Sequence, residues 1–242
     1  MRETFIVIPA NGRHAMITEL LKALGQPADH VILIDNGAEP PLKETHSYIA
    51  TIIEDRPSPL NIHRWWNLGW EIAASNAIGE YAVVFVNSDV MAWRNDVEVL
   101  VNALDTYNAS VAFYDHCKIL PTGGHLMRTD PGPGIWSHKM TDWFFAVRGE
   151  LETRFDETMA WWYGGDDFDW RARLEFDGVV MVPGAWAENR DVNGAQRDNP
   201  QLHAIIEGDR WLFTEKWGCC ILESTILNEE TYDRMVRKAV RL

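Results

Sequence analysis

The 242-residue sequence has little cysteine and no long apolar run. Its three cysteines, Cys117 and the adjacent pair Cys219 and Cys220, are too few for a disulfide framework and form no C-x-x-C redox pair. No apolar run reaches the roughly 18 residues that a membrane-spanning helix needs, and the apolar run at the N-terminus is too short for a signal peptide. We therefore expect a protein without a transmembrane segment, located in the cytoplasm.

Positive charge is also scarce. The chain carries 22 Lys and Arg against 36 Asp and Glu, a formal net charge of −14. Proteins that bind the phosphate backbone of nucleic acids need a basic surface, so this balance excludes general nucleic-acid binding. It does not exclude a polyanionic ligand that is held through a metal ion.

The rest of the composition is ordinary for a folded protein, with 46% hydrophobic and 24% charged residues. The length is sufficient for one domain or for two small ones, and the absence of a linker or repeat favours a single domain over residues 1–242. Twelve tryptophans stand out. An aromatic core explains most of them, while others have the shape to stack on a sugar or a nucleobase.

Short apolar runs alternate with helical patterns, as in a parallel sheet wrapped by helices. We expect an α/β fold with a mostly parallel central sheet flanked by helices, and a C-terminal helical tail. The expected strands are 5–8, 31–34, 49–53, 81–86, 111–114, 143–147 and 179–182. The expected helices are 16–24, 62–76, 97–104, 166–176, 201–217 and 229–242. Residues 119–140 are rich in Gly and Pro, and we expect a mobile loop there that closes over ligands.

Ligands of open α/β sheets bind at the carboxyl ends of the strands. The polar residues at those positions are Asn11 and Arg13 after the first strand, Asp35 after the second, and Asn87 and Asp89 after the apolar strand 81–86. This placement marks them as candidates without any motif.

Asn87-Ser88-Asp89 allows two interpretations. An aspartate after a buried strand suits Mg²⁺ or Mn²⁺, which prefer carboxylate oxygens and complete their shell with phosphates and water. The same three residues also suit an Asx turn that caps the next segment.

The stretch WWYGGDDFDWRAR, residues 161–173, crowds three aspartates after two glycines. Asp166 and Asp167 fit the start of a helix, where free N–H groups favour acidic side chains. Asp169 and Arg173 are four residues apart and fit a helical ion pair. The glycines and the preceding aromatic residues suggest the close approach of a ligand to the backbone.

Taken in order, these segments resemble the family-2-type, GT-A-fold nucleotide-sugar glycosyltransferases. The matching segments are IVIPANGR at 6–13, VILIDNG at 31–37, the N-x-G of Asn67 and Gly69 before GEY, NSD at 87–89, FDE at 155–157, GGDD at 164–167 with Asp169 and Arg173, and KWG at 216–218. The resemblance covers roughly residues 5 to 218.

The resemblance implies an inverting transfer of a sugar from a nucleotide-diphosphate donor, preferably a UDP-sugar, to an acceptor hydroxyl of unknown nature. Asp167 aligns with the catalytic base, and Asp166 replaces the usual glutamate beside it. Asp35 aligns with the contact to the nucleobase, Asn87 with the contact to ribose, and Asp89 with the ligand of Mn²⁺ or Mg²⁺. The other expected donor-binding residues are Pro9, Asn11, Arg13, Asn67, Ser88, Trp162 and Gly165.

Two departures from the family pattern affect the metal. Asn87 replaces the first acid of the D-x-D element, and no histidine follows the last strand. We expect Glu188 to substitute as a ligand, in a region that also holds Asn189 and Asp191. The resemblance further divides the chain into a donor-binding half (1–115), an acceptor and catalytic half (116–218) and a helical tail (219–242).

Other functions stay open. A protein of the same fold that binds nucleotide-sugars without turnover fits the two departures, and a sugar-phosphate nucleotidylyltransferase shares a similar sheet but needs a G-x-G-x-R loop that residues 9–13 match poorly. His116, His125 and His138 lie near Cys117, but their spacing matches no regular zinc pattern.

Overall fold

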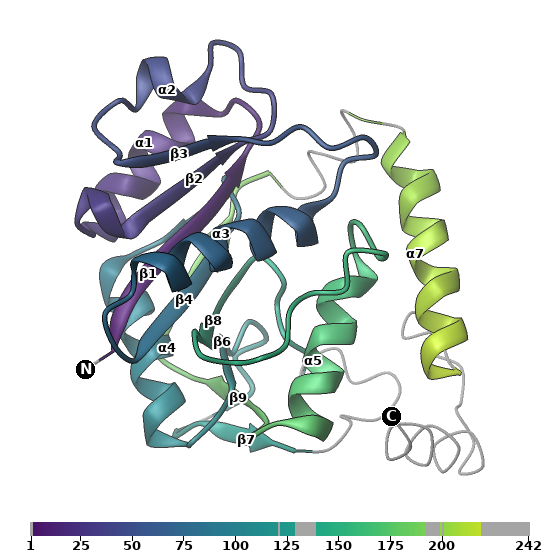
Figure 1. Ribbon diagram of the computed structural model, residues 1–242. Coiled ribbons are helices and arrows are strands. Elements are labelled where there is room, and N and C mark those ends of the chain that lie inside the picture. Colours follow the sequence, from purple (N-terminus) through teal and green to yellow (C-terminus); the bar gives the residue numbers. More distant parts are fainter. Residues whose placement is uncertain (1, 121, 129–138, 192–198, 200, 219–242) are drawn as a thin grey trace.

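The computed structural model describes residues 2–120, 122–128, 139–191, 199 and 201–218. Its main element is an eight-stranded sheet of order β3-β2-β1-β4-β8-β6-β9-β7 (Figure 1). The pairs from β3 to β4 and the pair β6–β9 are parallel, whereas β8 and β7 run antiparallel to their neighbours. The α/β class with a mostly parallel central sheet is therefore confirmed.

The strands of this sheet are short and mostly buried. They are β1 (Glu3–Ala10), β2 (Val31–Asp35), β3 (Thr51–Glu54), β4 (Tyr81–Val86), β6 (Val111–Tyr114), β7 (His125–Met127), β8 (Phe144–Arg148) and β9 (Val179–Val182). A second, two-stranded sheet pairs β5 (Val90–Ala92) with β10 (Ala187–Asn189).

The helices range from one turn to 17 residues. They are α1 (His14–Leu24), α2 (Leu42–Thr45), α3 (Ile62–Asn76), α4 (Arg94–Thr106), α5 (Tyr163–Glu175) and α7 (Gln201–Trp217), with a 3₁₀ turn at Ala28–His30.

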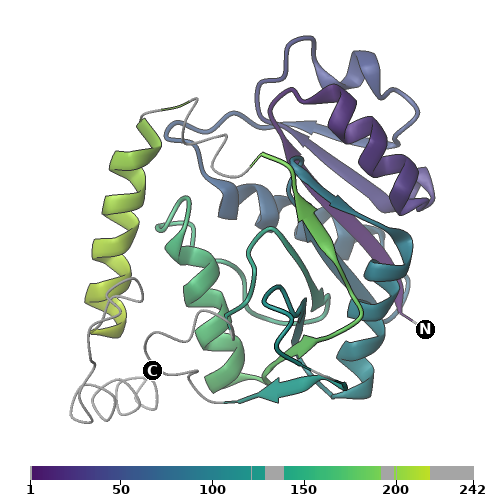
Figure 2. The same ribbon diagram turned by 180° about the vertical axis from the view of Figure 1, so that it is seen from behind.

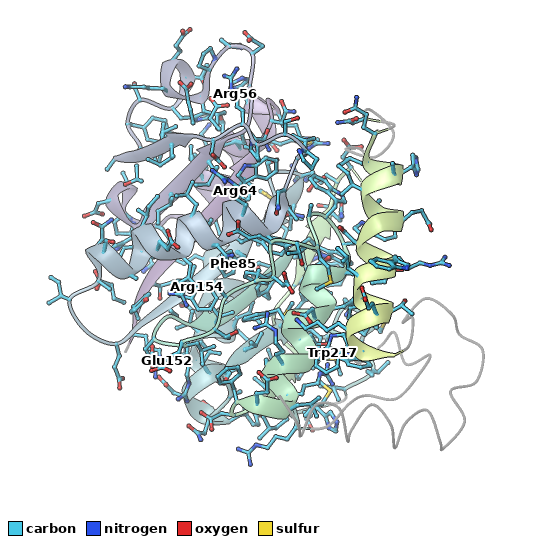
Figure 3. The ribbon with its side chains drawn as sticks, turned by 45° about the vertical axis from the view of Figure 1, so that its right-hand side comes forward. Arg56, Arg64, Phe85, Glu152, Arg154 and Trp217 are labelled. Carbon is cyan, nitrogen blue, oxygen red and sulfur yellow. The ribbon has the colours of Figure 1, made fainter. Side chains whose placement is uncertain are left out.

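Two helical layers cover the sheet, because alternate strand residues point to opposite faces. Ile6 and Ile8 pack with the apolar sides of α1 and α4 on one face. Phe5 and Val7 pack with α3 and α5 on the other face (Figures 1 and 2). Phe85 of β4 lies under α3, in an aromatic group with Trp66 and Trp70 (Figure 3).

Helix α7 packs on the outside of α5. Trp217 lies at the end of α7 (Figure 3). Its ring meets that of Trp170 on α5 edge to face, with ring centroids 5.1 Å apart. Among the described residues, no helix is long and apolar enough to cross a membrane.

The structure differs from the expected elements in several places. Helix α5 begins at Tyr163 and includes both glycines, whereas we expected its start at Asp166. Strand β7 lies inside the segment expected to be an irregular loop, and β3 is displaced to Thr51–Glu54. Strands β5 and β10 and helix α2 were not expected, since elements of three or four residues leave no periodic pattern.

Some predictions fall outside the described residues. They concern residues 129–138 of the expected loop at 119–140, which include His138, and the tail at 219–242, which includes the expected helix at 229–242 and two cysteines.

Candidate active site

The carboxyl edge of the sheet gathers the polar residues from three strands. Asn87 follows β4, and its N–H donates to the carbonyl of Trp143 at 3.0 Å. Because β8 runs antiparallel to β4, the residues that precede β8 reach the same edge. Asp142 is one of the residues that precede β8. The edge therefore holds Asp142 in addition to the acidic residues that follow parallel strands.

Arg13, which follows β1, lies close to two carboxylates at this edge. Its Nη2 lies 2.8 Å from Oδ2 of Asp191 and 3.9 Å from Oδ2 of Asp89. Burial raises the pKa of Asp89, as does the charge of Asp191, while Arg13 opposes this shift. The backbone carbonyl of Asp89 accepts from the N–H of Arg190, so β10 leads the chain directly to this pair.

Glu188 does not take part in this group through any contact that the structure shows. Its exposed carboxylate forms an ion pair with Arg190 at 3.4 Å. Asp191, three residues further on, is the acidic residue of this segment that shares a cation with Asp89. The geometry therefore favours Asp191 over Glu188 as the second carboxylate of a metal site.

Two carboxylates at a strand end suit a hard divalent cation, which commonly takes one or two protein carboxylates and completes its shell with phosphate oxygens and water. Asp89 and Asp191 are therefore a donor set of suitable chemistry. Among the residues that the structure describes, no group of three or more His, Cys, Asp or Glu side chains could hold a metal by itself.

Asp35 is fully buried, and its carboxylate accepts hydrogen bonds from the loop that follows β2. Its Oδ1 accepts from the N–H groups of Gly37 and Ala38, and its Oδ2 accepts from that of Leu42, at 2.8–2.9 Å. Three of the four acceptor positions of the carboxylate are thus in use. In this structure the side chain shapes the loop after β2, and its predicted contact with the nucleobase stays a prediction.

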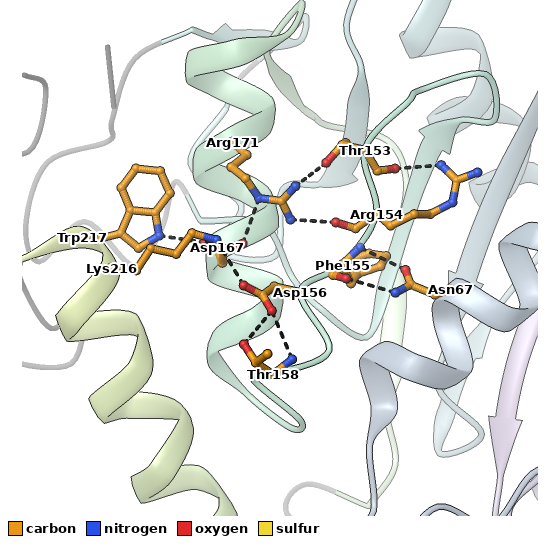
Figure 4. Close-up of polar contacts among 10 residues, drawn as sticks. All are labelled: Asn67, Thr153, Arg154, Phe155, Asp156, Thr158, Asp167, Arg171, Lys216 and Trp217. Atoms are coloured by element: carbon orange, nitrogen blue, oxygen red, sulfur yellow. Dashed lines mark hydrogen bonds and ion pairs between the residues drawn. The ribbon is translucent and has the colours of Figure 1, made fainter. Parts of the chain in front are cut away.

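Asn67 also has a structural role that the motif did not reveal. Its side chain exchanges two hydrogen bonds with the backbone of Phe155, at 2.9 and 3.0 Å (Figure 4). It also donates to Glu157 at 2.8 Å. Asn67 therefore fastens the FDE segment to α3 and has no free donor for a nucleotide. A Cβ on Gly69 would lie 2.3 Å from the side chain of Val7, so this glycine allows α3 to pack on β1.

The glycine pair that precedes the aspartates is explained by packing. A Cβ on Gly164 would lie 2.5 Å from the ring of His63, and one on Gly165 would lie 3.0 Å from Cβ of Asp142. Burial lowers the pKa of His63 to about 4, so this ring is a neutral core group at pH 7. The two glycines bring α5 close to two side chains of the fold. The predicted approach of a ligand to this backbone stays a prediction.

Asp167 lies in the interior, between α5 and α7. It is fully buried and accepts from Arg171 Nε, Trp217 Nε1 and Lys216 Nζ, each at 2.8 Å (Figure 4). Arg171 is held in turn by the segment 153–154, where its guanidinium donates to Thr153 and to the carbonyl of Arg154. These three donors enclose the carboxylate of Asp167 in this structure, and its predicted role as the base stays a prediction.

Asp169 forms the expected ion pair with Arg173. The guanidinium donates through Nε and Nη2 to the two carboxylate oxygens, at 2.8 and 2.9 Å, and both side chains are buried. The predicted helical pair is confirmed, and its burial shows that it belongs to the core beneath α5.

Asp166 is the accessible aspartate of the three. Its side chain is 25% exposed, and its Oδ1 lies 3.0 Å from Nζ of Lys139. Burial raises its pKa, with smaller contributions from Asp169 and Asp167, while Lys139 lowers it. Asp142 lies beside it, and burial together with the charge of Asp166 raises the pKa of Asp142 to about 7.

The remaining expected donor residues occupy varied places. Pro9 is buried within β1 and Ser88 is buried after β4, while Asn11 is exposed at the end of β1. Trp162 is half-buried. Its backbone N–H donates to the carboxylate of Asp209 on α7, as do the backbone N–H groups of Ala160 and Trp161. No contact tests the predicted roles of these residues toward a donor.

Sequence reasoning missed Asp142 and Lys139, and it did not foresee the burial of Asp167. No motif marks the first two. A signal for Asp167 was present, because Arg171 stands four residues after it, the same spacing that identified the pair of Asp169 and Arg173.

No family model and no curated protein sequence matches the chain. Solved structures do. The chain resembles S. aureus TarS, residues 1–349, at 14% identity over 98% of this chain and 70% of that one, with a TM-score of 0.58. A longer TarS structure is 13% identical, with a TM-score of 0.60, and the chain covers 43% of it.

A second resemblance is to glucosyl-3-phosphoglycerate synthase from Mycobacterium tuberculosis in complex with Mn²⁺, UDP-glucose and glycerol 3-phosphate. The identity is 18% over 86% of this chain and 80% of that one, with a TM-score of 0.55. A TarS structure in complex with UDP also matches. These similarities show that the chain has the GT-A fold.

Proposed function

We propose that the protein is a glycosyltransferase that moves a sugar from a nucleotide-diphosphate donor, with UDP-sugars favoured, to an acceptor hydroxyl. The observation that carries this proposal is the arrangement at one sheet edge. Asp89, Asp191 and Arg13 form a charged group suited to a diphosphate and its cation, and Asp166 presents a carboxylate from α5 at the same edge. The solved structures of this fold that hold UDP or UDP-glucose support the choice of donor.

Asp89 and Asp191 are the residues that would hold a divalent cation, Mn²⁺ being the ion present in the similar synthase. When bound, such a cation neutralises the charge that develops on the departing diphosphate. Arg13 is placed to contribute positive charge to the same phosphates, because its guanidinium already lies between the two carboxylates.

Asp166 acts as the base in this proposal. It accepts the proton of the acceptor hydroxyl while the oxygen forms its bond to the anomeric carbon and the bond from that carbon to the phosphate oxygen breaks. An attack from the face opposite the diphosphate inverts the configuration. Lys139 lies 3.0 Å from Oδ1 of Asp166 and helps to hold its carboxylate in place.

Binding and turnover can be measured separately. We expect UDP to stabilise the protein only when Mn²⁺ is present, by about 2.7 kcal/mol at a hundredfold excess over Kd. Asp89→Asn should remove most of this stabilisation, Asp191→Asn should reduce it, and the exposed control Glu188→Gln should leave it intact. Equal stabilisation in the presence of a chelator would reject the metal role.

Turnover is read as UDP released from UDP-glucose and other UDP-sugars, with a panel of hydroxyl acceptors. Ligand-dependent stabilisation without any release would favour a protein that binds nucleotide-sugars without transferring them. Absence of stabilisation by every nucleotide-sugar would reject both functions.

A further inference from the structure

Asp142 is a carboxyl group at this edge that the transfer step above does not use. It precedes β8, and its Oδ2 lies 3.5 Å from the position that a Cβ of Gly165 would occupy. Gly165 is followed directly by Asp166, so the absence of a side chain at 165 brings the carboxyl of Asp142 against the first turn of α5. The contact joins the amino end of a strand to the amino end of a helix.

Among the described residues, the charges around these two carboxyls do not balance. Lys139 lies 3.0 Å from Asp166, and it is the cation in this part of the structure that acts on both carboxyls. Asp167 and Asp169, on other faces of α5, add negative charge near Asp166 and already have their own arginine partners. Two partly buried carboxylates with one shared ammonium cannot both ionise at low cost.

We propose that Asp142 and Asp166 work as one pair that retains a single proton, with Asp142 as a positioning residue for the base. This inference rests on the proposed function for the role of Asp166. The neutral Asp142 donates its O–H to one oxygen of Asp166 and so fixes the orientation of the ionised carboxylate. Two carboxyl groups that share one proton titrate in two separated steps that belong to the pair.

The proton of Asp142 is retained during the reaction. The acceptor hydroxyl gives its proton to Asp166, the acceptor oxygen bonds to the anomeric carbon, and the diphosphate leaves with the bonding electrons. Loss of the Asp142 proton at higher pH removes the hydrogen bond and places a second negative charge beside the base, so transfer should slow above neutral pH.

The pairing can be tested without turnover. Carboxyl ¹³C NMR on protein labelled at aspartate Cγ should show a titration near pH 7 in the ligand-free chain. This titration should be absent in Asp142→Asn and should move to lower pH in Asp166→Asn, because the charge of residue 166 then disappears. Asp177→Asn, an exposed aspartate after α5, is the matched control and should leave it unchanged. The pairing would be overturned if a near-neutral titration persisted in Asp142→Asn, or if its midpoint stayed at the same pH in Asp166→Asn.

The effect on catalysis is read from the pH dependence of kcat/KM with UDP-glucose. The wild-type value should fall about tenfold for each pH unit above the pKa of the pair, as loss of one essential proton requires. Asp142→Asn keeps a hydrogen-bond donor without a titrating proton, so its profile should stay flat there, whereas Asp142→Ala should be slow at every pH. A decline in Asp142→Asn identical to that of the wild type would overturn the positioning role. If no variant turns over while the NMR result holds, the proposed function fails and the pair remains.

Discussion

Two adjacent aspartates of helix α5 lie in opposite environments, one partly exposed and one fully buried. Asp166, on the side that faces the sheet edge, is partly exposed and shares one lysine with a second carboxyl. Asp167, one residue later, is fully buried against α7 with three donors. Adjacent helical residues point about 100° apart, which is enough to place one in a site and the next in a core.

Under the proposed function, one short acidic sequence serves both stability and chemistry. Asp167 and Asp169 each have an arginine four residues later, and they point about 160° apart around the helix. They fasten α5 to α7 and to the core beneath it, and Asp166 is the member left to face the edge.

The largest effect that we expect separates Asp166 from Asp167 in turnover. Asp166→Asn removes the proton acceptor and should lower kcat by about 10²–10⁴, the usual scale for loss of a general base, with little change in melting temperature. Asp167→Asn should lower the melting temperature instead and keep kcat within about tenfold of the wild type. The measurement is UDP release together with thermal unfolding for both variants. The reverse pattern would return the base to Asp167 and break the comparison.

A second variant tests the core side of α5 alone. Asp169→Asn leaves the buried guanidinium of Arg173 without its counter-charge and should reduce the free energy of unfolding by about 3–5 kcal/mol. Replacing both partners by apolar residues, Asp169→Leu with Arg173→Met, should recover part of this loss. Urea denaturation of the single and double variants measures it. A loss below about 1 kcal/mol in the single variant would show that the pair is solvated.

A third variant, Asp142→Asn, tests how the stability of the protein depends on pH through the carboxyl at the sheet edge. The folded-state pKa of Asp142 is raised to about 7, above the usual value for aspartate, so the wild type loses stability as pH rises between about 4 and 7. Asp142→Asn does not titrate and should avoid this loss. Its melting temperature should exceed that of the wild type by a few degrees at pH 8 and match it at pH 4. Thermal scans at both values measure the difference, and a gain that does not depend on pH would contradict the shift.

The smallest effect concerns the contact with α7. Lys216 bridges Asp167 at 2.8 Å and Asp156 at 3.2 Å, and its side chain is 29% exposed. Lys216→Met should destabilise the protein by about 1 kcal/mol, since solvent screens a partly exposed charge. Its effect on kcat should be smaller still, and thermal unfolding with UDP release checks both. A large fall in kcat at unchanged stability would mean that Lys216 acts on the reaction itself.

Much of this arrangement was predictable from local patterns. Buried strands followed by polar residues marked Arg13, Asn87 and Asp89 as residues of one edge, and the structure places them there. The spacing of Asp169 and Arg173 predicted an ion pair that forms as expected. The backbone hydrogen bonds of Asn67 and Asp35 were not predictable, because hydrogen bonding to the chain's own backbone leaves no sequence pattern that differs from ligand binding.

The sequence by itself determined the α/β class, the strand ends that form the edge and the helical spacing of the acidic residues, because these depend on short-range periodicity. Only the tertiary structure decided which acids lie at this edge and which are enclosed in the core. The antiparallel insertion of β8 between β4 and β6 carries Asp142 to the carboxyl edge, and the packing of α7 on α5 encloses Asp167. Strand direction and the rotation of a helix against its neighbours depend on contacts between residues far apart in the chain, which no local pattern records.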